Sequence, residues 1–533
     1  MTTLLIILAA AAAALGVATL LRLPTIPVLI VSGLAFGGLM SVFPQTTHER
    51  TDFIDVELIK DALVLGLTFL VFAAGLELNP ARVMHRRRAA LFIGLAQFSC
   101  LLIIGTGVAM LFDLSLMAAL HLGLAVAASS TVVAVRILQK RRQFFEPFGR
   151  LVLGVLLLQD ILLIVIIAAL SGAEHGLFGI ASATLATLAL VGLTWLCARW
   201  IAPTLIITLK LDQDSLLLVA LALLFGFAGL AYAMKIPPVI GCFLAGVSLS
   251  GFPVNGVVRG QLQSLNQFFL AIFFVCLGAI LNVPTSGQIL LVITMVALIL
   301  VVTPVIVVIV AERFGISTRA AIESGLLLAQ SSELSILVAV VGVAGGYLES
   351  DMLSVISLVA IITMILTSFI ATDAVTWKLL HLRPALRRDL AGEAPTEHIV
   401  MLGCGSNSQV LLDLLLLEGH RVVVADDDPV VIATLRGRGI DAIRGDGADP
   451  QVLSALSAEN ARVIISTMRR IEDNERLIAR VKGPIVLVRI AGDSESRRIE
   501  RAGGVAIRED LAAAADFMNW FNTRFQHNTM KPA

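Results

Sequence analysis

The chain has 533 residues, of which 58% are hydrophobic and 15% are charged, and its formal net charge at pH 7 is zero. This balance is typical of an integral membrane protein, and it provides no bulk attraction to nucleic acid. The five cysteines form no CxxC pair and the eight histidines form no ligand cluster, so neither a disulfide framework nor a metal site is expected.

The apolar segments, taken in chain order, predict thirteen membrane spans separated by short polar breaks. The first span is rich in alanine, as a signal-peptide cleavage zone is, but no basic residues precede it, so we expect it to be retained. Most lysines and arginines lie in the loops after odd-numbered spans, which predicts an N-terminus outside and a C-terminus in the cytoplasm. The predicted spans lie near residues 3–21, 26–43, 61–78, 88–112, 116–138, 149–171, 178–198, 214–234, 237–251, 264–282, 286–311, 319–346 and 350–373.

The sixth span carries one carboxylate, Asp160, close to its middle. An ionised aspartate at the bilayer centre costs about 2.5–3.5 kcal/mol at the least, and such residues mark ion or proton pathways. The simplest site that can exchange two ions is one carboxylate that binds a proton and a cation in turn. The alternative is a buried aspartate that only forms hydrogen bonds to neighbouring helices.

An internal repeat relates the two halves of the membrane region. Residues 123–130 and 325–332 both read G-L-x-x-A-x-S-S, and shorter matches relate span two to span nine and span three to span ten. Each pair is seven spans apart, so its members cross the membrane in opposite directions. This pattern predicts an inverted-topology repeat, with spans one to six matching spans eight to thirteen.

Inverted-repeat transporters bind their substrate near the midplane, beside discontinuous helices. We therefore expect spans five and twelve to be broken and to cross next to Asp160. Hydroxyl groups in the breaks can satisfy freed backbone groups or coordinate a cation. The alternative is that the small serines only permit close helix packing. The residues expected around the ion are Ser129, Ser130 and Thr131 from span five, and Ser332 and Glu333 from span twelve.

Three motifs together resemble the Kef-type potassium/proton antiporters of the monovalent cation:proton antiporter superfamily. They are A-x-S-S-T-V at 127–132, L-L-x-Q-D at 156–160 and S-S-E-L at 331–334. The resemblance implies that Asp160 is the exchanging carboxylate and that Gln159, its neighbour in the ion site, marks the potassium-type branch. One departure is that span eleven, at 301–304, lacks the core lysine or arginine of many relatives.

The same resemblance implies a homodimer in the bacterial inner membrane, with a dimerisation domain and a mobile core that moves like an elevator. It also allows for a small ancillary regulatory subunit. The transported ions would be H⁺ and K⁺, with Na⁺ as the alternative cation.

The composition changes after the transmembrane region, which we place at 1–380. Residues 381–397 contain two prolines and a glycine and predict a linker. An α/β pattern follows over 398–521, and it resembles the TrkA-N or RCK domains that regulate potassium channels and transporters. Residues 522–533 form a short polar tail that we expect to be frayed.

The first predicted strand of this domain runs into a glycine turn and a helix, which is the arrangement of a Rossmann-like nucleotide site. Gly403, Gly405 and Ser406 would let phosphate approach the helix N-terminus. Asp426, about twenty residues on, suits ribose hydroxyls, and Asp446 matches the TrkA-N pattern. The expected ligand is NAD(H) or an AMP-like adenine nucleotide. The alternative is an empty pocket in a domain that serves only to dimerise.

We therefore predict a multi-span α-helical membrane protein with a cytoplasmic Rossmann-like α/β domain, acting as a cation:proton antiporter and not as an enzyme. A sodium-selective antiporter of the same fold is the first alternative. A ligand-gated cation channel would need a carbonyl filter such as TVGYG, which this sequence lacks. A membrane-anchored NAD-dependent oxidoreductase would need a substrate domain with a general acid or base after the nucleotide fold, and we expect none.

Overall fold

The structure is a computed structural model, and it forms two compact units. The first unit contains Met1–Val310 and Ile322–Thr376, and the second contains Ala311–Ala321 and Trp377–Ala533. The predicted linker lies outside the described residues except for its two ends. The predicted domain boundaries stay predictions. The structure describes residues 2–21, 25–42, 56–77, 87–140, 147–172, 176–201, 204, 213–251, 254–281, 284–381, 397–490 and 492–525.

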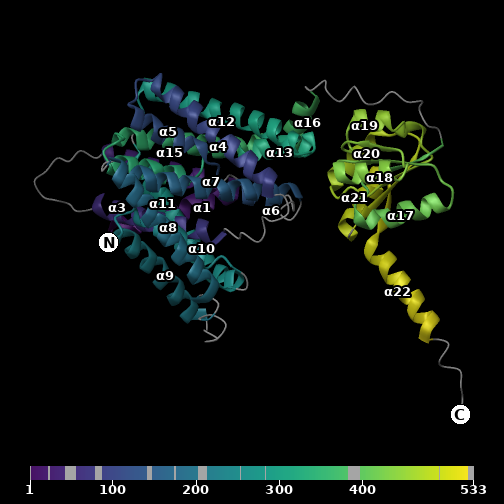
Figure 1. Cartoon of the computed structure of the whole chain (residues 1–533), viewed down its shortest axis with the longest axis horizontal. Coiled ribbons are helices and arrows are strands. Elements are labelled where there is room, and N and C mark those ends of the chain that lie inside the picture. The colour runs from purple at the N-terminus through teal and green to yellow at the C-terminus, as the bar shows by residue number, and fades with distance from the viewer. Residues whose placement is uncertain are drawn as a thin grey trace, which may run out of the picture. The chain divides into compact units, whose positions relative to one another are not determined.

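The described part of the first unit is built of helices (Figure 1). Long apolar segments form helices in a membrane because only internal hydrogen bonds can satisfy the backbone there. Of the helices described, eight are long and apolar enough to cross a membrane by length and composition alone. The helices in unbroken spans are α1 (Thr2–Leu21), α2 (Thr25–Val42), α3 (Val56–Glu77), α4 (Arg87–Met110), α7 (Pro147–Ser171), α8 (Gly176–Leu196), α9 (Gln213–Ala233), α10 (Pro238–Ser248), α11 (Val254–Ile280), α12 (Ser286–Arg313) and α15 (Ser350–Ile370).

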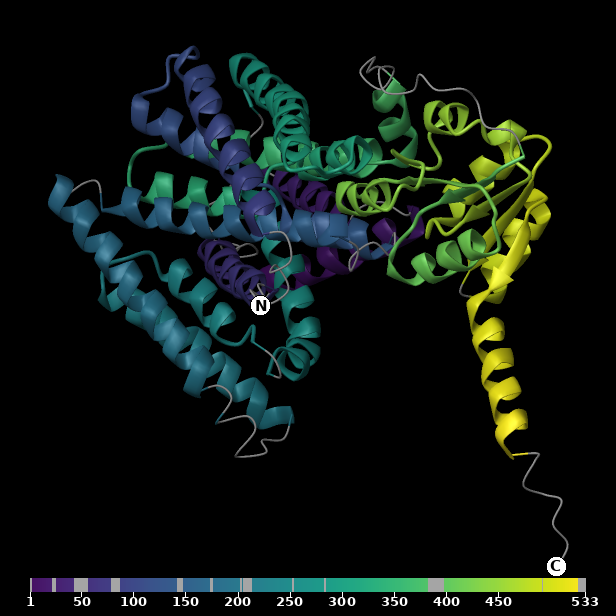
Figure 2. The ribbon, with the colours of Figure 1, turned by 45° about the vertical axis from the view of Figure 1, so that its right-hand side comes forward.

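Two spans are each divided between two helices, as predicted. Span five consists of α5 (Leu116–Ala127) and α6 (Thr131–Lys140), and span twelve consists of α13 (Thr318–Leu328) and α14 (Leu334–Ala344). Helix α14 packs against α5, so the two broken spans are neighbours. Figure 2 shows the helices of this unit from a second direction.

Helix packing reproduces the repeat seen in the sequence. Helix α2 packs against α11 while α3 packs against α10, so each contact joins one half of the unit to the other. Gly123 and Gly325, which open the two G-L-x-x-A-x-S-S motifs, make equivalent close approaches in the two halves. A Cβ on Gly123 would lie 2.3 Å from Oγ1 of Thr106 on α4, and one on Gly325 would lie 2.7 Å from Cα of Pro304 on α12. Each glycine therefore brings its broken span against the span before it.

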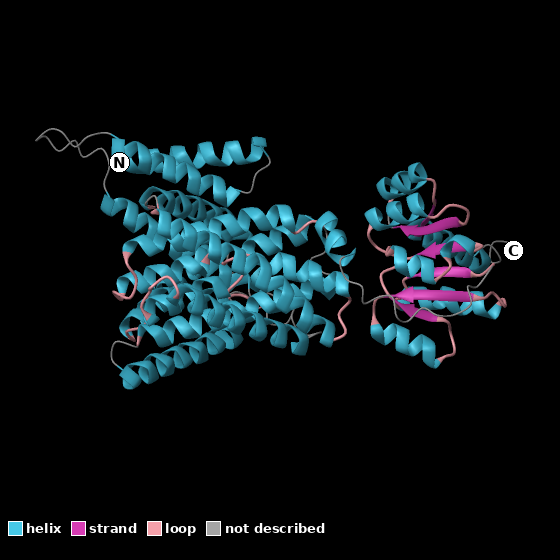
Figure 3. Cartoon of the chain, turned by 90° about the horizontal axis from the view of Figure 1, so that it is seen from above, coloured by secondary structure: helices cyan, strands magenta, loops and turns pink. Residues whose placement is uncertain are grey.

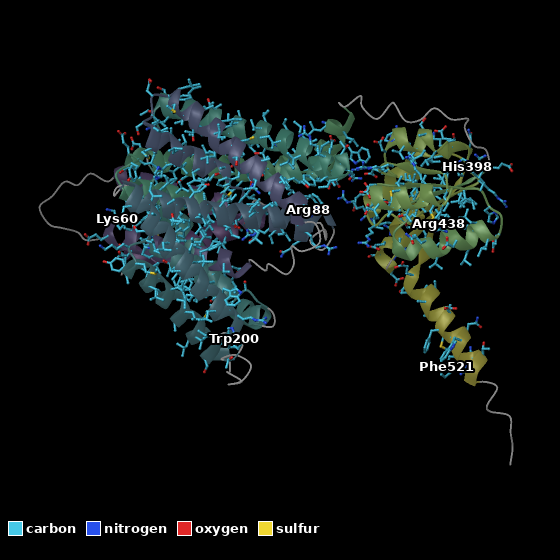
Figure 4. All side chains as sticks on the ribbon, in the orientation of Figure 1. Lys60, Arg88, Trp200, His398, Arg438 and Phe521 are labelled. Atoms are coloured by element: carbon cyan, nitrogen blue, oxygen red, sulfur yellow. The ribbon has the colours of Figure 1, made fainter. Side chains whose placement is uncertain are left out.

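Two labelled cations of the first unit lie at opposite ends of it (Figure 4). Lys60 lies in the N-terminal part of α3, and Arg88 lies at the start of α4. This separation agrees with loops that alternate across a membrane.

The second unit contains a β-sheet, drawn in magenta in Figure 3. Its six strands are all parallel and lie in the order β3-β2-β1-β4-β5-β6. The strand order reverses between β1 and β4, which is where doubly wound sheets bind ligands. The strands are β1 (Ile399–Leu402), β2 (Val422–Asp426), β3 (Ala442–Arg444), β4 (Val463–Ser466), β5 (Ile485–Ile490) and β6 (Val505–Arg508).

Helices cover both faces of this sheet. Leu412, Ile432 and Leu435 from α17 and α18 pack on one face, while α19, α20 and α21 pack on the other. Helix α22 extends away from the sheet and carries the exposed Phe521 (Figure 4), and it reaches four residues into the predicted tail. The helices are α17 (Ser406–Leu417), α18 (Pro429–Gly437), α19 (Pro450–Ala455), α20 (Ile471–Arg480), α21 (Asp493–Ala502) and α22 (Glu509–Phe525), while α16 (Asp373–His381) is divided between the two units.

The close approach at Gly123 generates a stability prediction. Gly123→Ala should destabilise the protein by about 1–3 kcal/mol, because the added methyl group overpacks the contact with α4. Gly107→Ala on α4 is the matched control, since a Cβ there meets nothing within 4 Å. Thermal unfolding of the detergent-purified variants measures both effects, and equal stability of the two variants would contradict the packing.

Candidate functional site

The two helix breaks lie against each other in the buried centre of the first unit. The first break is residues 128–130, between α5 and α6, and the second break is residues 329–333, between α13 and α14. Ser129 Oγ donates to the Leu328 carbonyl at the end of α13, at 2.7 Å. Ser331 Oγ donates to the Ala125 carbonyl near the end of α5, at 2.8 Å. The last carbonyls of a helix have no partner within that helix. Each break therefore supplies hydroxyl groups that satisfy the helix end of the other.

Asp160 lies on α7 beside the first break and is 1% exposed. Its Oδ2 accepts a hydrogen bond from Oγ1 of Thr131, the first residue of α6, at 3.0 Å. The neighbouring hydroxyl, Ser130 Oγ, donates to Glu333 Oε2 from the second break, at 2.6 Å. The adjacent residues Ser130 and Thr131 thus donate to two buried carboxylates, Glu333 from the second break and Asp160 from α7.

Gln159 contacts the backbone of the first break. Its Oε1 accepts from the Ser129 amide at 3.1 Å, and its Nε2 donates to Oε1 of Gln97 on α4 at 2.7 Å. Ser332 Oγ accepts from the Leu334 amide at the start of α14, at 3.1 Å. The structure therefore places Gln159 and Ser332, both predicted to bind the ion, in hydrogen bonds that hold the breaks.

Sequence reasoning missed several polar residues that complete these hydrogen bonds. Thr363 Oγ1 on α15 accepts from the Ser331 amide at 3.0 Å, and Thr367 Oγ1 donates to the Ala329 carbonyl at 2.7 Å. Gln97 was the easiest to find, because it is an amide in the middle of an apolar span. The two threonines gave no such signal, since threonine is common in membrane helices.

The glycine turn and the acidic residue predicted for nucleotide binding come together in the second unit. Gly403 has a φ of +84°, and the Asp426 carboxylate at the end of β2 is buried. Asp426 Oδ2 accepts from the Cys404 amide at 2.6 Å, and its Oδ1 accepts from the Asp428 amide at 2.8 Å. Gly405 caps α17, and a Cβ there would meet nothing within 4 Å, so the turn is open to a ligand. Ser406 begins α17, but its side chain lies outside the described residues.

Asp446 lies in an ion cluster that the sequence did not predict. Arg319, from the Ala311–Ala321 part of the second unit, places Nη1 2.6 Å from Asp446 Oδ2 and 2.9 Å from Asp473 Oδ2. Its Nη2 donates to Asp473 Oδ1 at 3.0 Å, and its guanidinium lies 5.0 Å from the ring centroid of Trp377. Burial raises the pKa of the Asp473 carboxyl, and the charge of Arg319 partly opposes that rise.

With both sites described, comparison with known proteins identifies the family. The family model for the transmembrane sodium/hydrogen exchanger matches residues 5–377. The chain belongs to this family. Its members are transporters and not enzymes, which confirms the choice of an antiporter over an oxidoreductase. The TrkA-N domain matches residues 399–508, which confirms the class of the second unit.

Two individual proteins support the assignment. The glutathione-regulated potassium-efflux system protein KefC of Klebsiella pneumoniae subsp. pneumoniae is 27% identical over 446 residues, covering 80% of this chain and 70% of that protein. The sodium proton antiporter MjNhaP1 of Methanocaldococcus jannaschii is 16% identical, covers 71% of this chain and all of that one, and superimposes with a TM-score of 0.53. The similarity to KefC confirms the resemblance to Kef-type antiporters. The superposition on MjNhaP1 shows the fold alone.

The ion cluster around Arg319 generates a pH-dependent prediction. Arg319→Gln should destabilise the second unit by about 3–5 kcal/mol, because it leaves the buried carboxylate of Asp473 without its buried cation. Without Arg319 the pKa of Asp473 rises further, so the loss is largest at alkaline pH and shrinks as the pH falls and Asp473 takes up a proton. Amide hydrogen exchange of α20 in the full chain, corrected for intrinsic exchange rates, measures this change.

Arg476→Gln is the matched control for that measurement. Arg476 also faces Asp473, at 3.6 Å, but its side chain is 43% exposed. An exposed ion pair contributes about 0–1 kcal/mol, so the control should exchange nearly as the wild type does. Equal effects of the two substitutions, or a loss that does not depend on pH, would contradict the role given to Arg319.

Proposed function

We propose that this antiporter exchanges K⁺ for H⁺ by alternating access, with Asp160 as the group that holds each ion in turn. The observation that carries the proposal is the buried position of Asp160 beside Thr131, the residue at which α6 begins after the break in span five. A carboxylate removed from water is stable when it is protonated or when a cation lies against it. Two ions that require the same oxygen atoms cannot both be bound, so movement of one is coupled to movement of the other.

The surroundings of Asp160 suit a cation that has lost part of its water shell. Hydroxyl groups and the free carbonyls of broken helices are hard oxygen ligands of the kind that bind monovalent cations in transporters. Thr131 contacts Asp160 directly, and Ser130 with Glu333 provides a second carboxylate one residue away. In this proposal Ser129 and Ser332 shape the site through the backbone, while Thr131 and the two carboxylates face the ion.

Na⁺ is the alternative cation, because the family model and the MjNhaP1 fold both concern sodium antiporters. K⁺ is favoured by the similarity to KefC and by Gln159, which in the resemblance marks the potassium branch. We further propose a homodimer in a bacterial inner membrane, with the N-terminus outside and the second unit in the cytoplasm. A small ancillary subunit stays a prediction.

We propose that the second unit binds an adenine nucleotide, NAD(H) or AMP, and regulates transport. The open turn at Gly405 and the buried Asp426 beside it fit such a ligand. The phosphate would lie at the N-terminus of α17, and Asp426 would accept from ribose hydroxyls. Asp446, which the sequence also assigns to this site, accepts a hydrogen bond from Arg319.

Transport by Asp160 can be tested in vesicles that contain the purified protein. Asp160→Asn should reduce cation-dependent dissipation of a pH gradient to the level of protein-free vesicles, because an amide cannot exchange a proton for a cation. Asp113→Asn, in the turn between α4 and α5, is the control and should behave as the wild type does. K⁺, Na⁺ and Li⁺ are compared in the same assay. Undiminished proton movement in the Asp160 variant would eliminate the assignment.

Nucleotide binding provides a separate test. Asp426→Ala should weaken binding of NADH or AMP by about 10–100-fold, which is the expected loss of a hydrogen bond to a charged group. Asp441→Ala, whose side chain is 65% exposed, is the matched control and should bind normally. Calorimetric titration of the purified full chain measures both, together with unfolding temperatures to confirm that the second unit is intact. Wild-type affinity in the Asp426 variant would place the ligand elsewhere.

A further inference from the structure

Gln97 is a fully buried amide that the transport proposal does not use. It lies on α4, which packs against α7 near Gly94, where an added Cβ would be 2.8 Å from Cδ2 of Leu158. This close approach brings Gln97 opposite Gln159, the residue that precedes Asp160. Gln97 Nε2 donates to Ser129 Oγ at 3.1 Å, while its Oε1 accepts from Gln159 Nε2 at 2.7 Å.

One backbone group determines the direction of every hydrogen bond in this set. The Ser129 amide can only donate, so the group 3.1 Å from it must be the oxygen of Gln159. The nitrogen of Gln159 then faces Gln97, which must present its own oxygen there and direct its nitrogen at Ser129 Oγ. Ser129 Oγ accepts that bond and donates its proton to the Leu328 carbonyl. The usual ambiguity of amide orientation is thereby removed.

The resulting ring joins three segments that surround the proposed ion site. It contains α4 through Gln97, α7 through Gln159 and the first break through Ser129, and it extends to the second break through Leu328. Thr131, which donates to Asp160, lies two residues after Ser129. If the Gln159 amide moved, the first break would therefore move with it, and so would the Thr131 hydroxyl that donates to Asp160.

We propose that Gln97 is a positioning residue of the ion site, which holds the Gln159 amide against the Ser129 backbone and so determines where Thr131 meets Asp160. This inference rests on the proposed function at Asp160. It predicts that Gln97 acts on cation affinity without touching the cation. The alternative is that Gln97 contributes only to helix packing, in which case its loss would lower the amount of folded protein and leave cation affinity unchanged.

Two substitutions at Gln97 separate these possibilities. Gln97→Met removes both hydrogen bonds at similar volume, so the apparent KM for K⁺ should rise about 10-fold with a smaller change in the maximal rate. A protonated Gln97→Glu side chain can still accept from Gln159 and donate to Ser129, whereas an ionised one can only accept. This variant should keep near wild-type affinity at acidic pH and lose it as the pH rises.

The pH comparison must allow for the native carboxylates near the ring. Asp160 follows Gln159 and Glu333 accepts from Ser130, and both are present in the wild type. The measured quantity is therefore the ratio of variant KM to wild-type KM at each pH. Gln139→Met and Gln139→Glu, at an exposed position of α6, are the matched controls and should keep that ratio near one at every pH.

A double variant tests whether Gln97 acts through Gln159. If it does, Gln97→Met combined with Gln159→Met should raise KM no more than the more severe single substitution. Additive effects would overturn the proposal. So would a wild-type KM in Gln97→Met, a loss that only follows the amount of folded protein, or a Gln97→Glu variant that behaves as Gln97→Met at all pH values. Continued transport by Asp160→Asn would instead refute the function on which the inference rests.

Discussion

The structure of the membrane unit depends on the exchange of hydrogen bonds between two broken helices. Ser129 donates to the Leu328 carbonyl at the end of α13, and Ser331 donates to the Ala125 carbonyl near the end of α5, so these two carbonyls are satisfied in the apolar interior. An unsatisfied backbone group would cost several kcal/mol in lipid, which is why irregular backbone survives only where such partners exist. The breaks in turn place the hydroxyl groups of Ser130 and Thr131 where they donate to Glu333 and Asp160.

Span eleven has no basic residue at 301–304, and neutral groups of neighbouring helices contact span twelve and its break. Helix α12 contributes Pro304 to the packing of Gly325, and threonines of α15 supply hydrogen bonds to the second break. Neutral hydroxyl groups therefore stabilise the second break. Next to it, two buried carboxylates, Asp160 and Glu333, accept hydrogen bonds from adjacent residues, and such a site favours a bound proton or cation.

Much of the fold and of both candidate sites could be predicted from the sequence, because the sequence signals for these features are local. The spans follow from apolar runs, the breaks from repeated serine pairs, and the nucleotide turn from Gly403, Gly405 and Asp426. The contacts of Gln97 with Gln159, and of Arg319 with Asp446 and Asp473, could not be predicted. They depend on which helices become neighbours, and periodicity within one segment carries no information about that. For the same reason the hydrogen bond between the Gln159 amide and the backbone of the first break could not be predicted.

The central claim is that one carboxylate holds a proton and a cation in turn. The most direct measurement is proton release when K⁺ is added to the detergent-purified protein in weakly buffered solution, with bound K⁺ determined in parallel. The account predicts release that saturates with K⁺ binding and disappears in Asp160→Asn. Binding of K⁺ without proton release, or release that persists in that variant, would contradict it.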